Sequence, residues 1–545
     1  PPPTDWWFLA NTVEHVPLAV APDGRSVAFV AHGFGRAPML WLRRFDNVEA
    51  RPIAGTEGAT SLTFAPDGTA LSFVAGGKLK RIGLAGGSSV TICDVAPGIG
   101  HALSWGTTGD LLFASVDGLA IFRVSAAGGV PRKVVEAGAA RGVQRIAWPI
   151  FLPDGRGFLY LERASDGRDA LKLVEGEASA RNVAPLASRV ELAGDDWLLF
   201  ARDGALLAQR FDRSGARLSG SAVSVAPRIR YFYSTGWAGF AASTSGTIVA
   251  LTGQNARRLT WFDRAGKRLG TVGETADYLT LALAPDGRSV VVDRTVAELG
   301  TYDLWRIDLE RGVETRLTTD ADTQVQAVWH PDGKRLVYST KRERAPILVR
   351  RGLASGAEEL LLPSESFQLA TDISPDGRLL AYKERGDSGQ FQARLLDLAG
   401  DDRRPCELVP ESIGATDARF SPDGRAIAYL ADTTGRTELY LAPLERPTDA
   451  VRVSGAGARL FRWSRSGGEL VFLSHDDEMI AVPAKTAPLL ELGAPAVLWK
   501  HAVPGSWAAF DLAPDGERFL AIVVEQGASI VPASVILGWR PESPR

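Results

Sequence analysis

The side chains that could bind a metal ion or transfer a proton are scattered along this 545-residue sequence. Its six histidines stand far apart, at His15, His32, His101, His330, His475 and His501. No two of them have the HExxH spacing that places paired imidazoles on one helix face for zinc. The three consecutive acids in SHDDEM (474–479) lack the alternating ligands and the glycine of a calcium-binding loop. We therefore predict no metal site and no cofactor.

Motifs for covalent catalysis and phosphoryl transfer are missing from the sequence as well. It contains no G-x-S-x-G elbow, which presents the nucleophilic serine of many hydrolases, and no HRD or DFG motif of a protein kinase. The glycine-rich stretch HGFGRAP (32–38) lacks the third glycine of a phosphate-binding loop, and we interpret it as a turn between two strands. The sequence therefore predicts that the chain is not an enzyme.

An aspartate recurs in Pro-Asp-Gly triplets, and a ring of such carboxylates could bind a metal or transfer protons. The triplets end at Gly24, Gly68, Gly155, Gly287, Gly333, Gly377, Gly424 and Gly516. Turn chemistry explains these residues without any site, because proline fixes φ, aspartate hydrogen-bonds forward to the backbone, and glycine accepts a positive φ. We therefore assign the aspartates to β-turns.

The triplets mark a repeat, since each follows a short apolar run and precedes an alternating one, as in FSPDGRAIAYLA (420–431). Degenerate corners at Gly109, Gly194, Gly246 and Gly467 complete a series of twelve, spaced about 45 residues apart. The second repeat divides into four strands, SLTFA, TALSFVA, GKLKRIGL and SSVTICD. Repeats of this kind are typical of β-propeller blades, which cannot bury both faces alone and therefore stack.

A single ring of twelve blades would enclose a wide channel, whereas propellers usually have four to eight blades. We therefore predict an all-β fold, a tandem double β-propeller of two six-bladed rings with four-stranded blades. The first ring is expected over residues 1–256 and the second over 257–545, with the junction strands 257–274 shared. We expect WWFLANTV (6–13) to close the first ring, and KRLGTV (267–272) to close the second against SVILGW (534–539).

The composition limits the possible partners. The 61 basic and 64 acidic residues leave a formal charge of −3, without the basic surface that nucleic acid needs. No run of 18 apolar residues could span a membrane, and the sequence has no secretory signal. The two cysteines, Cys93 and Cys406, favour neither a disulfide framework nor a zinc site. Because the chain starts at Pro1 without methionine, we expect a processed or excised piece of a longer protein.

The repeats, and the form FSPDGRAIAYLAD (420–432) in particular, resemble the TolB-like propeller repeats. The order of local phrases is similar to the extracytoplasmic propeller region of bacterial membrane-anchored serine/threonine protein kinases. These phrases, which cover nearly the whole chain, are ARPIAGTEGA (50–59), GKLKRIGLAGG (77–87), FLPDGRGFLYL (151–161), LLFARDGALLAQRFD (198–212), LTWFDRAGKRLG (259–270), DLWRIDLERGVETRLT (303–318), GRTELYLAPL (435–444), GGELVFLS (467–474) and PDGERFLAI (514–522). Such regions also end near Asn-Trp, where this chain has Gly538 and Trp539.

The resemblance implies a kinase domain and a membrane anchor upstream, with this chain on the periplasmic or extracellular face of a bacterial membrane. The chain itself would be a non-catalytic binding or sensor module that recognises a protein, peptide or glycan. A free-standing periplasmic or surface scaffold subunit of a larger complex is the alternative. An enzyme with its active site in the propeller channel would need acids or histidines from several blades at one channel mouth, and we find no such set in the sequence.

We call the four strands of a blade a to d in chain order. Binding is expected on the face formed by the loops that join strand d of one blade to strand a of the next and strand b to strand c. Two loops, 227–240 and 500–510, combine arginine or histidine with the aromatic residues that are enriched in binding hot spots. The candidate contact residues are Arg228, Arg230, Tyr231, Tyr233, Trp237, His501 and Trp507. The alternative for 227–240, that its aromatic side chains plug the ring centre or pack between the two propellers, stays open.

Overall fold

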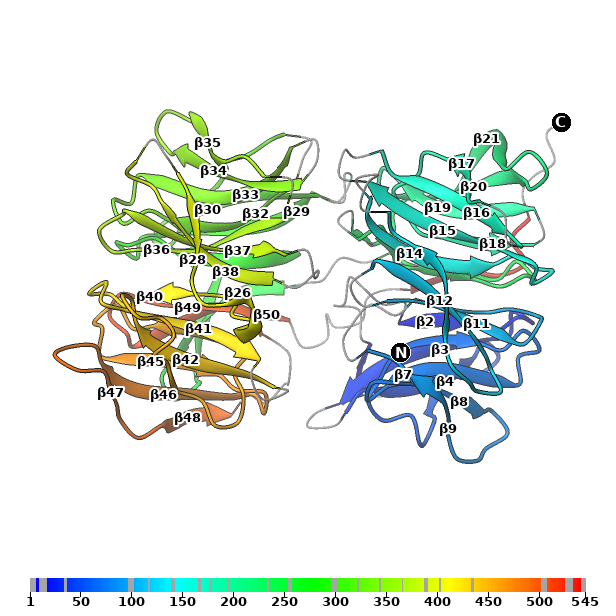
Figure 1. The fold of residues 1–545 in the computed structure, drawn as a ribbon, viewed down its shortest axis with the longest axis horizontal. Coiled ribbons are helices and arrows are strands. Elements are labelled where there is room, and N and C mark those ends of the chain that lie inside the picture. Colours follow the sequence, from blue (N-terminus) through cyan, green and yellow to red (C-terminus); the bar gives the residue numbers. More distant parts are fainter. Residues whose placement is uncertain are drawn as a thin grey trace. The chain divides into compact units, whose positions relative to one another are not determined.

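The computed structural model describes residues 6–8, 17–33, 37–96, 102–115, 118–138, 143–164, 168–176, 179–194, 196–232, 235–252, 257–296, 301–320, 323–342, 345–364, 366–386, 391–400, 403–432, 436–500, 507–524 and 533–540. These residues form antiparallel sheets, with one short 3-10 turn, η2 (Glu411–Ile413), among them (Figure 1). The chain divides into two compact units. Unit 1 comprises Pro1–Gln254, Ala297–Gly300 and Gly527–Arg545, and unit 2 comprises Asn255–Val296 and Thr301–Gln526.

The described residues of unit 1 form six larger sheets, which we call blades 1 to 6, and one two-stranded sheet. Their strands are β1 (Trp6–Phe8), β2 (Leu18–Val20), β3 (Ser26–Gly33), β4 (Met39–Arg44) and β5 (Ala50–Pro52) in blade 1; β6 (Ala59–Phe64), β7 (Ala70–Ala75), β8 (Lys78–Gly83) and β9 (Val90–Asp94) in blade 2; β10 (Leu103–Trp105), β11 (Asp110–Ala114), β12 (Ala120–Ser125) and β13 (Arg132–Glu136) in blade 3; β14 (Val143–Phe151), β15 (Gly157–Ala164), β16 (Ala170–Glu175) and β17 (Arg181–Ala184) in blade 4; β18 (Val190–Ala193), β19 (Trp197–Arg202), β20 (Ala205–Asp212) and β21 (Arg217–Ala226) in blade 5; and β24 (Phe240–Ala242), β25 (Ile248–Leu251) and β51 (Ala533–Ile536) in blade 6. A small hairpin of β22 (Tyr231–Phe232) and β23 (Trp237–Ala238) connects blades 5 and 6 in the sequence.

Unit 2 contains six further sheets, blades 7 to 12. Their strands are β28 (Tyr278–Leu283), β29 (Ser289–Val296), β30 (Thr301–Asp308) and β31 (Glu314–Arg316) in blade 7; β32 (Gln324–Trp329), β33 (Arg335–Arg342), β34 (Ala345–Gly352) and β35 (Glu358–Leu362) in blade 8; β36 (Gln368–Ile373), β37 (Leu379–Arg385), β38 (Phe391–Asp397) and β39 (Pro405–Glu407) in blade 9; β40 (Arg419–Phe420), β41 (Ala426–Asp432), β42 (Thr437–Pro443) and β43 (Val451–Arg452) in blade 10; β44 (Leu460–Trp463), β45 (Glu469–Leu473), β46 (Glu478–Lys485), β47 (Glu491–Leu492) and β48 (Ala496–Lys500) in blade 11; and β49 (Trp507–Leu512), β50 (Arg518–Val524), β26 (Arg257–Asp263) and β27 (Arg268–Ala276) in blade 12.

The blades of each unit close into a ring through their innermost strands. In unit 1 the contacts run from β2 through β6, β10, β14, β18 and β24 back to β2. In unit 2 they run from β49 through β28, β32 and β36 to β40, and from β44 back to β49, while blades 10 and 11 share an apolar cluster. The predicted fold, two six-bladed rings of four-stranded blades, is therefore confirmed. In the described residues, blades 1 and 11 have a fifth strand and blade 6 has three.

The strands that complete the two rings differ from those we predicted. β51 pairs with β25, with Ile536 opposite Ile248, so that the C-terminal strand belongs to blade 6 of unit 1. The expected pairing of KRLGTV with SVILGW is therefore wrong. β27, which contains most of KRLGTV, pairs instead with β26, and β26 pairs with β50 in blade 12 (Figure 1). β1 pairs with β3 inside blade 1, so the prediction that it completes the last blade of the first ring is also wrong.

These pairings insert unit 2 between the second and third strands of blade 6. A strand with a free edge can pair with any strand of suitable length and alternation that reaches it, and the sequence alone does not specify which one does. The ranges 1–256 and 257–545 remain a prediction of how the chain divides into folding domains.

The core consists of twelve apolar clusters, one between each pair of neighbouring blades in the described residues. Because successive side chains of a strand point to opposite faces, one strand serves two clusters. In β3, Val27 and Phe29 pack toward blade 6, and Ala28 and Val30 pack toward blade 2. The second strand of each blade is therefore apolar on both faces.

The Pro-Asp-Gly corners are β-turns, as the sequence predicted. At the first corner the Gly24 amide donates to the Ala21 carbonyl, and Gly24 has a φ of 70°. The Asp23 carboxylate accepts the amide N–H of Arg25, two residues on. The same forward hydrogen bond forms at Asp67, Asp154, Asp286, Asp332, Asp376, Asp423 and Asp515. These carboxylates are occupied by their own turns.

Candidate functional site

The candidate loop 227–240 contains the β22–β23 hairpin, and its tryptophan is buried. Trp237 is 2% exposed and belongs to an apolar cluster with Trp148 and Leu161 of blade 4 and Leu251 of blade 6. The Trp148 indole donates to the Thr235 carbonyl over 2.8 Å. Because this cluster draws on blades 1, 3, 4 and 6, it crosses the ring axis. Trp237 fills the centre of the first ring, so a ligand cannot reach its ring without displacing the hairpin.

Three other candidate residues lie beside this hairpin. Arg228 is exposed, and Arg230 is half-buried with its guanidinium 5.8 Å from the centre of the Trp237 ring. The Tyr231 hydroxyl donates to the Ala187 carbonyl over 2.9 Å. These contacts anchor the hairpin, and Arg228, Arg230 and Tyr231 remain predicted ligand contacts.

The remaining candidates cannot be placed next to them. Tyr233 and His501 lie outside the described residues, as does the side chain of Trp507, whose backbone begins β49. His501 and Trp507 belong to unit 2, whereas the hairpin belongs to unit 1. Arg230, Tyr231 and Trp237 therefore lie together in unit 1. The second candidate loop, 500–510, remains a separate prediction.

Unit 2 has a set of charged side chains at its ring centre that the sequence analysis did not recognise. They stand five residues before the corner glycine on the innermost strands of four successive blades. These residues are Asp372 in blade 9, Arg419 in blade 10, Arg462 in blade 11 and Asp511 in blade 12. Asp372 of blade 9 and Asp511 of blade 12 thus both lie near Arg462, a set of charges that we did not find in the sequence. The fixed distance to the corner glycine is the signal that could have revealed the set.

Three buried or half-buried carboxylates of unit 2 join neighbouring blades. The carboxylate of Asp511 accepts the amide N–H of Leu283 in blade 7 over 2.9 Å. In the same way Asp293 accepts the N–H of Gln326, and Asp372 accepts the N–H of Phe420, each over 2.9 Å. The innermost strand of a blade has one edge without a strand partner, so its amides need acceptors from elsewhere. These carboxylates supply them.

Burial and the neighbouring charges shift the pKa values of two residues in this set, Arg462 and Asp372. Burial lowers the pKa of Arg462 to about 10, with Arg419 adding to the shift and three carboxylates opposing it. Arg462 Nε lies 3.5 Å from Asp511 Oδ1. Burial also raises the pKa of Asp372, against the attraction of Arg419. The set is a compact, charge-compensated cluster, and pairing of this kind suits a structural role better than proton transfer.

Asp293 and Asp417 show the two opposite effects of burial and pairing. Burial raises the pKa of Asp293 to about 7, against the hydrogen bonds from Gln326 and Thr280. Burial acts in the same direction on Asp417, but Lys383, 3.0 Å away, together with Arg419 and Arg462, outweighs it and lowers the pKa of that carboxyl. A carboxyl with a pKa near 7 can exchange protons at physiological pH. However, Asp293 is 0% exposed, so no substrate touches it.

A cleft of about 650 Å³ lies between blades 9 and 10 of unit 2. It is lined by Phe391, Gln392, Glu411, Ser412, Gly414, Thr416, Ala431, Asp432 and Thr437. These residues come from the start of β38, the connection that contains η2, the end of β41 and the start of β42. The cleft therefore opens on the face of the d–a and b–c loops, away from the Pro-Asp-Gly corners. Binding was predicted on this face from the sequence, but none of these lining residues was predicted.

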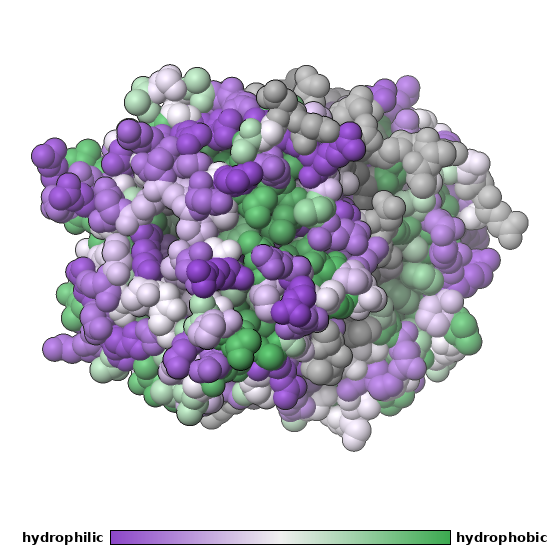
Figure 2. Space-filling model, turned by 60° about the vertical axis from the view of Figure 1, so that its left-hand side comes forward, coloured by the Kyte–Doolittle hydropathy of each residue, from purple (hydrophilic) through white to green (hydrophobic). Residues whose placement is uncertain are grey.

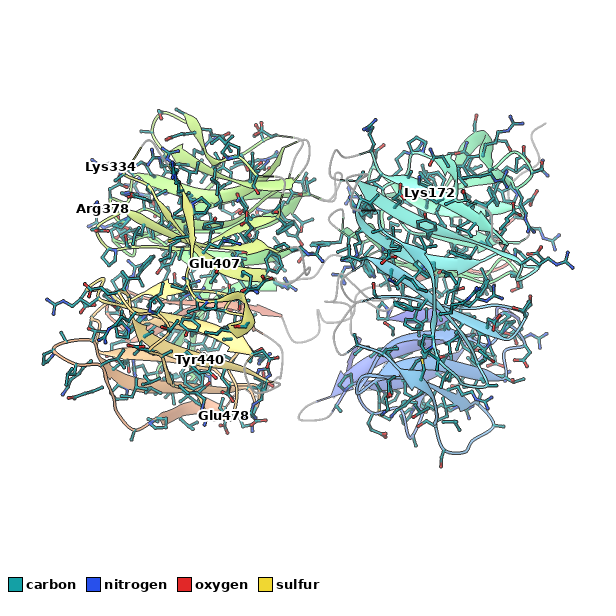
Figure 3. The ribbon with its side chains drawn as sticks, in the orientation of Figure 1. Lys172, Lys334, Arg378, Glu407, Tyr440 and Glu478 are labelled. Atoms are coloured by element: carbon teal, nitrogen blue, oxygen red, sulfur yellow. The ribbon has the colours of Figure 1, made fainter. Side chains whose placement is uncertain are left out.

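A smaller lobe of about 160 Å³ continues the cleft along blade 9 and shares Gln392 and Glu411 with it. The lobe contains an ion-pair group in which Arg394 lies 2.9 Å from Glu384 and 3.8 Å from Glu407, the latter labelled in Figure 3. Hydrophilic residues make up most of the face shown in Figure 2, with smaller apolar patches among them. The lining residues of the two lobes are themselves mainly polar, so a ligand there would be recognised mainly through polar contacts.

The aromatic residue of the cleft is held in place by its neighbours. The Phe391 ring packs edge-on against Phe367, with 5.7 Å between ring centres. The ammonium group of Lys383 lies 5.6 Å from the Phe391 ring centre and is also paired with Asp417. Phe391 therefore forms a fixed apolar wall. Among the described residues, no group of three His, Cys, Asp or Glu side chains could hold a metal ion.

No family model matches the chain. Among solved structures it is similar to a putative TolB from Agrobacterium tumefaciens, with 20% identity and a TM-score of 0.41 over 50% of this chain and 99% of that one. It is also similar to TolB from Acinetobacter baumannii, with 14% identity and a TM-score of 0.28 over 72% of this chain and 79% of that one. The tricorn protease shows 13% identity and a TM-score of 0.33 over 88% of this chain and 58% of that one.

The TolB-like resemblance of the repeats remains an expectation from the sequence. The link to kinase ectodomains remains a prediction. In the described residues, no helix is long and apolar enough to cross a membrane.

Proposed function

We propose that this chain is a non-catalytic binding module whose ligand, a protein or peptide segment or a glycan, binds in the cleft between blades 9 and 10. The observation that carries the proposal is the cleft itself, whose volume of about 650 Å³ lies within the usual range of ligand sites. Amide, hydroxyl and carboxylate groups stand there beside one aromatic wall. Because blades 9 and 10 hold these groups on strand ends and a short turn, the site is preorganised.

We place this module on the periplasmic or extracellular face of a bacterial membrane, as the ectodomain of a receptor-like serine/threonine kinase. The TolB-like repeats and the order of the phrases in the sequence support this part of the proposal. In it, the kinase domain and the anchor precede Pro1, and the chain reports ligand binding to them. The near-balance of acidic and basic residues supports a partner other than nucleic acid.

A cleft-filling variant tests the binding function. Ser412 is exposed at the cleft, so Ser412→Trp should block the cleft without disturbing the core. Ser355→Trp, on the exposed turn between β34 and β35, adds the same side chain elsewhere on unit 2. We expect the ligands found with a displayed peptide library and a glycan array to be lost with Ser412→Trp and kept with Ser355→Trp. If every ligand survives Ser412→Trp, the cleft is not the binding site.

The reading frame upstream of the codon for Pro1 tests the receptor part. A kinase domain followed by one membrane span would support the receptor. A signal peptide directly before Pro1 would instead favour the alternative, a free-standing scaffold subunit in a larger complex.

A further inference from the structure

The cleft between blades 9 and 10 has an uneven charge, which restricts its ligand. Its larger lobe contains the carboxylates of Glu411 and Asp432 and no lysine or arginine among its lining residues. Both acids are exposed. An anionic ligand would therefore be repelled from this lobe, and a cationic one attracted.

The smaller lobe does not reverse this charge. It adds Glu384 and Glu407 as acids, and Arg385 and Arg394 as bases. Arg394 is already paired with both of these acids. Over the two lobes, four carboxylates stand against two guanidiniums, which leaves the lining with a net negative charge.

The shape of the larger lobe also suits a long basic side chain. Phe391 lines it as an apolar wall, and the methylene stem of a lysine or arginine packs on such a surface while its charged end stays in polar surroundings. Lys383, the cation that lies over the Phe391 ring, is paired with Asp417 rather than with Glu411 or Asp432. The charge of Lys383 is thus balanced by Asp417.

We propose that the cleft binds a basic segment of a peptide or protein, with an arginine or lysine side chain lying along Phe391 and its cationic end at Glu411 and Asp432. This inference rests on the proposed binding function and specifies its ligand. A neutral saccharide would use the same hydroxyl and amide groups but would gain nothing from the carboxylate charge. The charge therefore favours the basic peptide.

Selection from a random heptapeptide display library on the immobilised full chain tests the proposal. We expect arginine and lysine to be enriched on the wild-type chain, and this enrichment to vanish with Glu411→Gln/Asp432→Asn. Individual enriched peptides should bind the double variant about tenfold more weakly, and citrulline in place of arginine should have a similar effect. The matched control is Glu310→Gln/Glu445→Gln, which neutralises two exposed acids of unit 2 outside the cleft and should leave the affinity unchanged.

Two results would overturn the proposal, and they differ in what they say about the cleft. If acidic or neutral peptides, or neutral glycans on an array, bind in a way that Ser412→Trp abolishes, the ligand class is wrong and the binding function stands. If neither peptide nor glycan binding depends on Ser412, both the ligand class and the proposed function fail.

Discussion

The centre of the first ring is filled mainly by indole side chains with one buried guanidinium, that of Arg189, 6.0 Å from the Trp148 ring centre. The centre of the second ring holds several guanidiniums and carboxylates. In unit 1, Trp148 and Trp237 meet in one apolar cluster that spans the ring. In unit 2, the innermost strands bring Arg419, Arg462 and Asp511 together with further acids. Two rings built on one blade plan thus solve the same packing problem with different chemistry.

One part of this chemistry is common to both rings. In unit 1 the Ser104 hydroxyl accepts the amide N–H of Phe151 from the next blade over 3.0 Å, as Asp372 does for Phe420 in unit 2. Both Ser104 and Asp372 stand five residues before a corner glycine. A neutral hydroxyl is therefore sufficient to satisfy the free edge of an inner strand. The charges of unit 2 exceed what this need requires.

Burying charges carries a desolvation cost, and replacing a buried ion pair by apolar residues is often neutral or stabilising. The first ring limits this cost, because indoles fill most of its centre and the guanidinium of Arg189, which is 4% exposed, is paired with Glu191. The cleft of the proposed function lies in unit 2, so the ring with more charge at its centre is also the ring proposed to bind a ligand.

Among the substitutions that test how the two ring centres differ, Trp237→Ala should have the largest effect on stability. Removing a 2%-exposed indole from the centre of unit 1 should lower the free energy of unfolding of that unit by about 4 kcal/mol. Hydrogen exchange measured by mass spectrometry should show the loss in blades 1 and 4 and much less in blades 8 and 9. Trp261→Ala, at a half-buried tryptophan of unit 2, is the control and should cost about 1 kcal/mol. Equal losses from both variants would contradict a special role of the first ring centre.

Asp293→Asn should change how the stability of unit 2 depends on pH. Since burial raises the pKa of Asp293 to about 7, the native state keeps a proton that the unfolded state releases near pH 4. The stability from this group is therefore complete below pH 4 and lost as the pH rises through 7, by up to about 4 kcal/mol. The variant lacks this loss, so its stability relative to the wild type should rise from pH 5 to pH 8.

Urea unfolding at both pH values measures this difference. Parallel pH profiles for the wild type and Asp293→Asn would mean that the carboxyl ionises freely in the native state. The cost assigned to buried charge in unit 2 would then lack support from this carboxyl.

The fold could be predicted because its signal is local and repeated. Each Pro-Asp-Gly corner specifies a turn by its own backbone preferences, and twelve corners at even spacing specify the blades. The ring closures could not be predicted, because the pairing of β51 with β25 joins residues almost 300 positions apart, Ile248 and Ile536, with no local signature. Both partners are short alternating strands that would suit other edges equally well.

The residues of the candidate site were harder to predict from the sequence than the fold. Arg230, Tyr231 and Trp237 were identified by composition, which does not distinguish a plug from a contact surface. Phe391 and Glu411 were missed because Phe391 begins a strand of blade 9 and Glu411 lies in the connection to blade 10, and only the folded chain brings them together. Asp372 and Asp511 could have been found by aligning the repeats on the corner glycine, since both stand at one fixed position.

Arg462→Met should show how much stability the second ring loses when Asp511 is left without the nearby guanidinium. With Arg462 and Asp511 only 12% and 18% exposed, the variant leaves a poorly solvated carboxylate and should lose about 3 kcal/mol. Arg462→Met/Asp511→Asn removes both charges and keeps an acceptor for the Leu283 amide, so it should cost less than the sum of the single changes. A double-mutant cycle by urea unfolding should give a coupling of about 1–2 kcal/mol. Additive losses would mean that the two charges do not stabilise each other.

Ser104→Ala and Asp372→Asn should have the smallest effects, and together they separate the acceptor from the charge. Ser104→Ala leaves the Phe151 amide without its acceptor, which should cost about 1 kcal/mol. Asp372→Asn keeps an acceptor for the Phe420 amide and removes a charge whose ionisation burial already disfavours, so it should change stability by less than about 0.5 kcal/mol. Urea unfolding of both variants measures the difference. If Asp372→Asn cost more stability than Ser104→Ala, the charge of Asp372 itself would stabilise the second ring. The larger number of charges at the second ring centre would then be explained by stability, without a role in ligand binding.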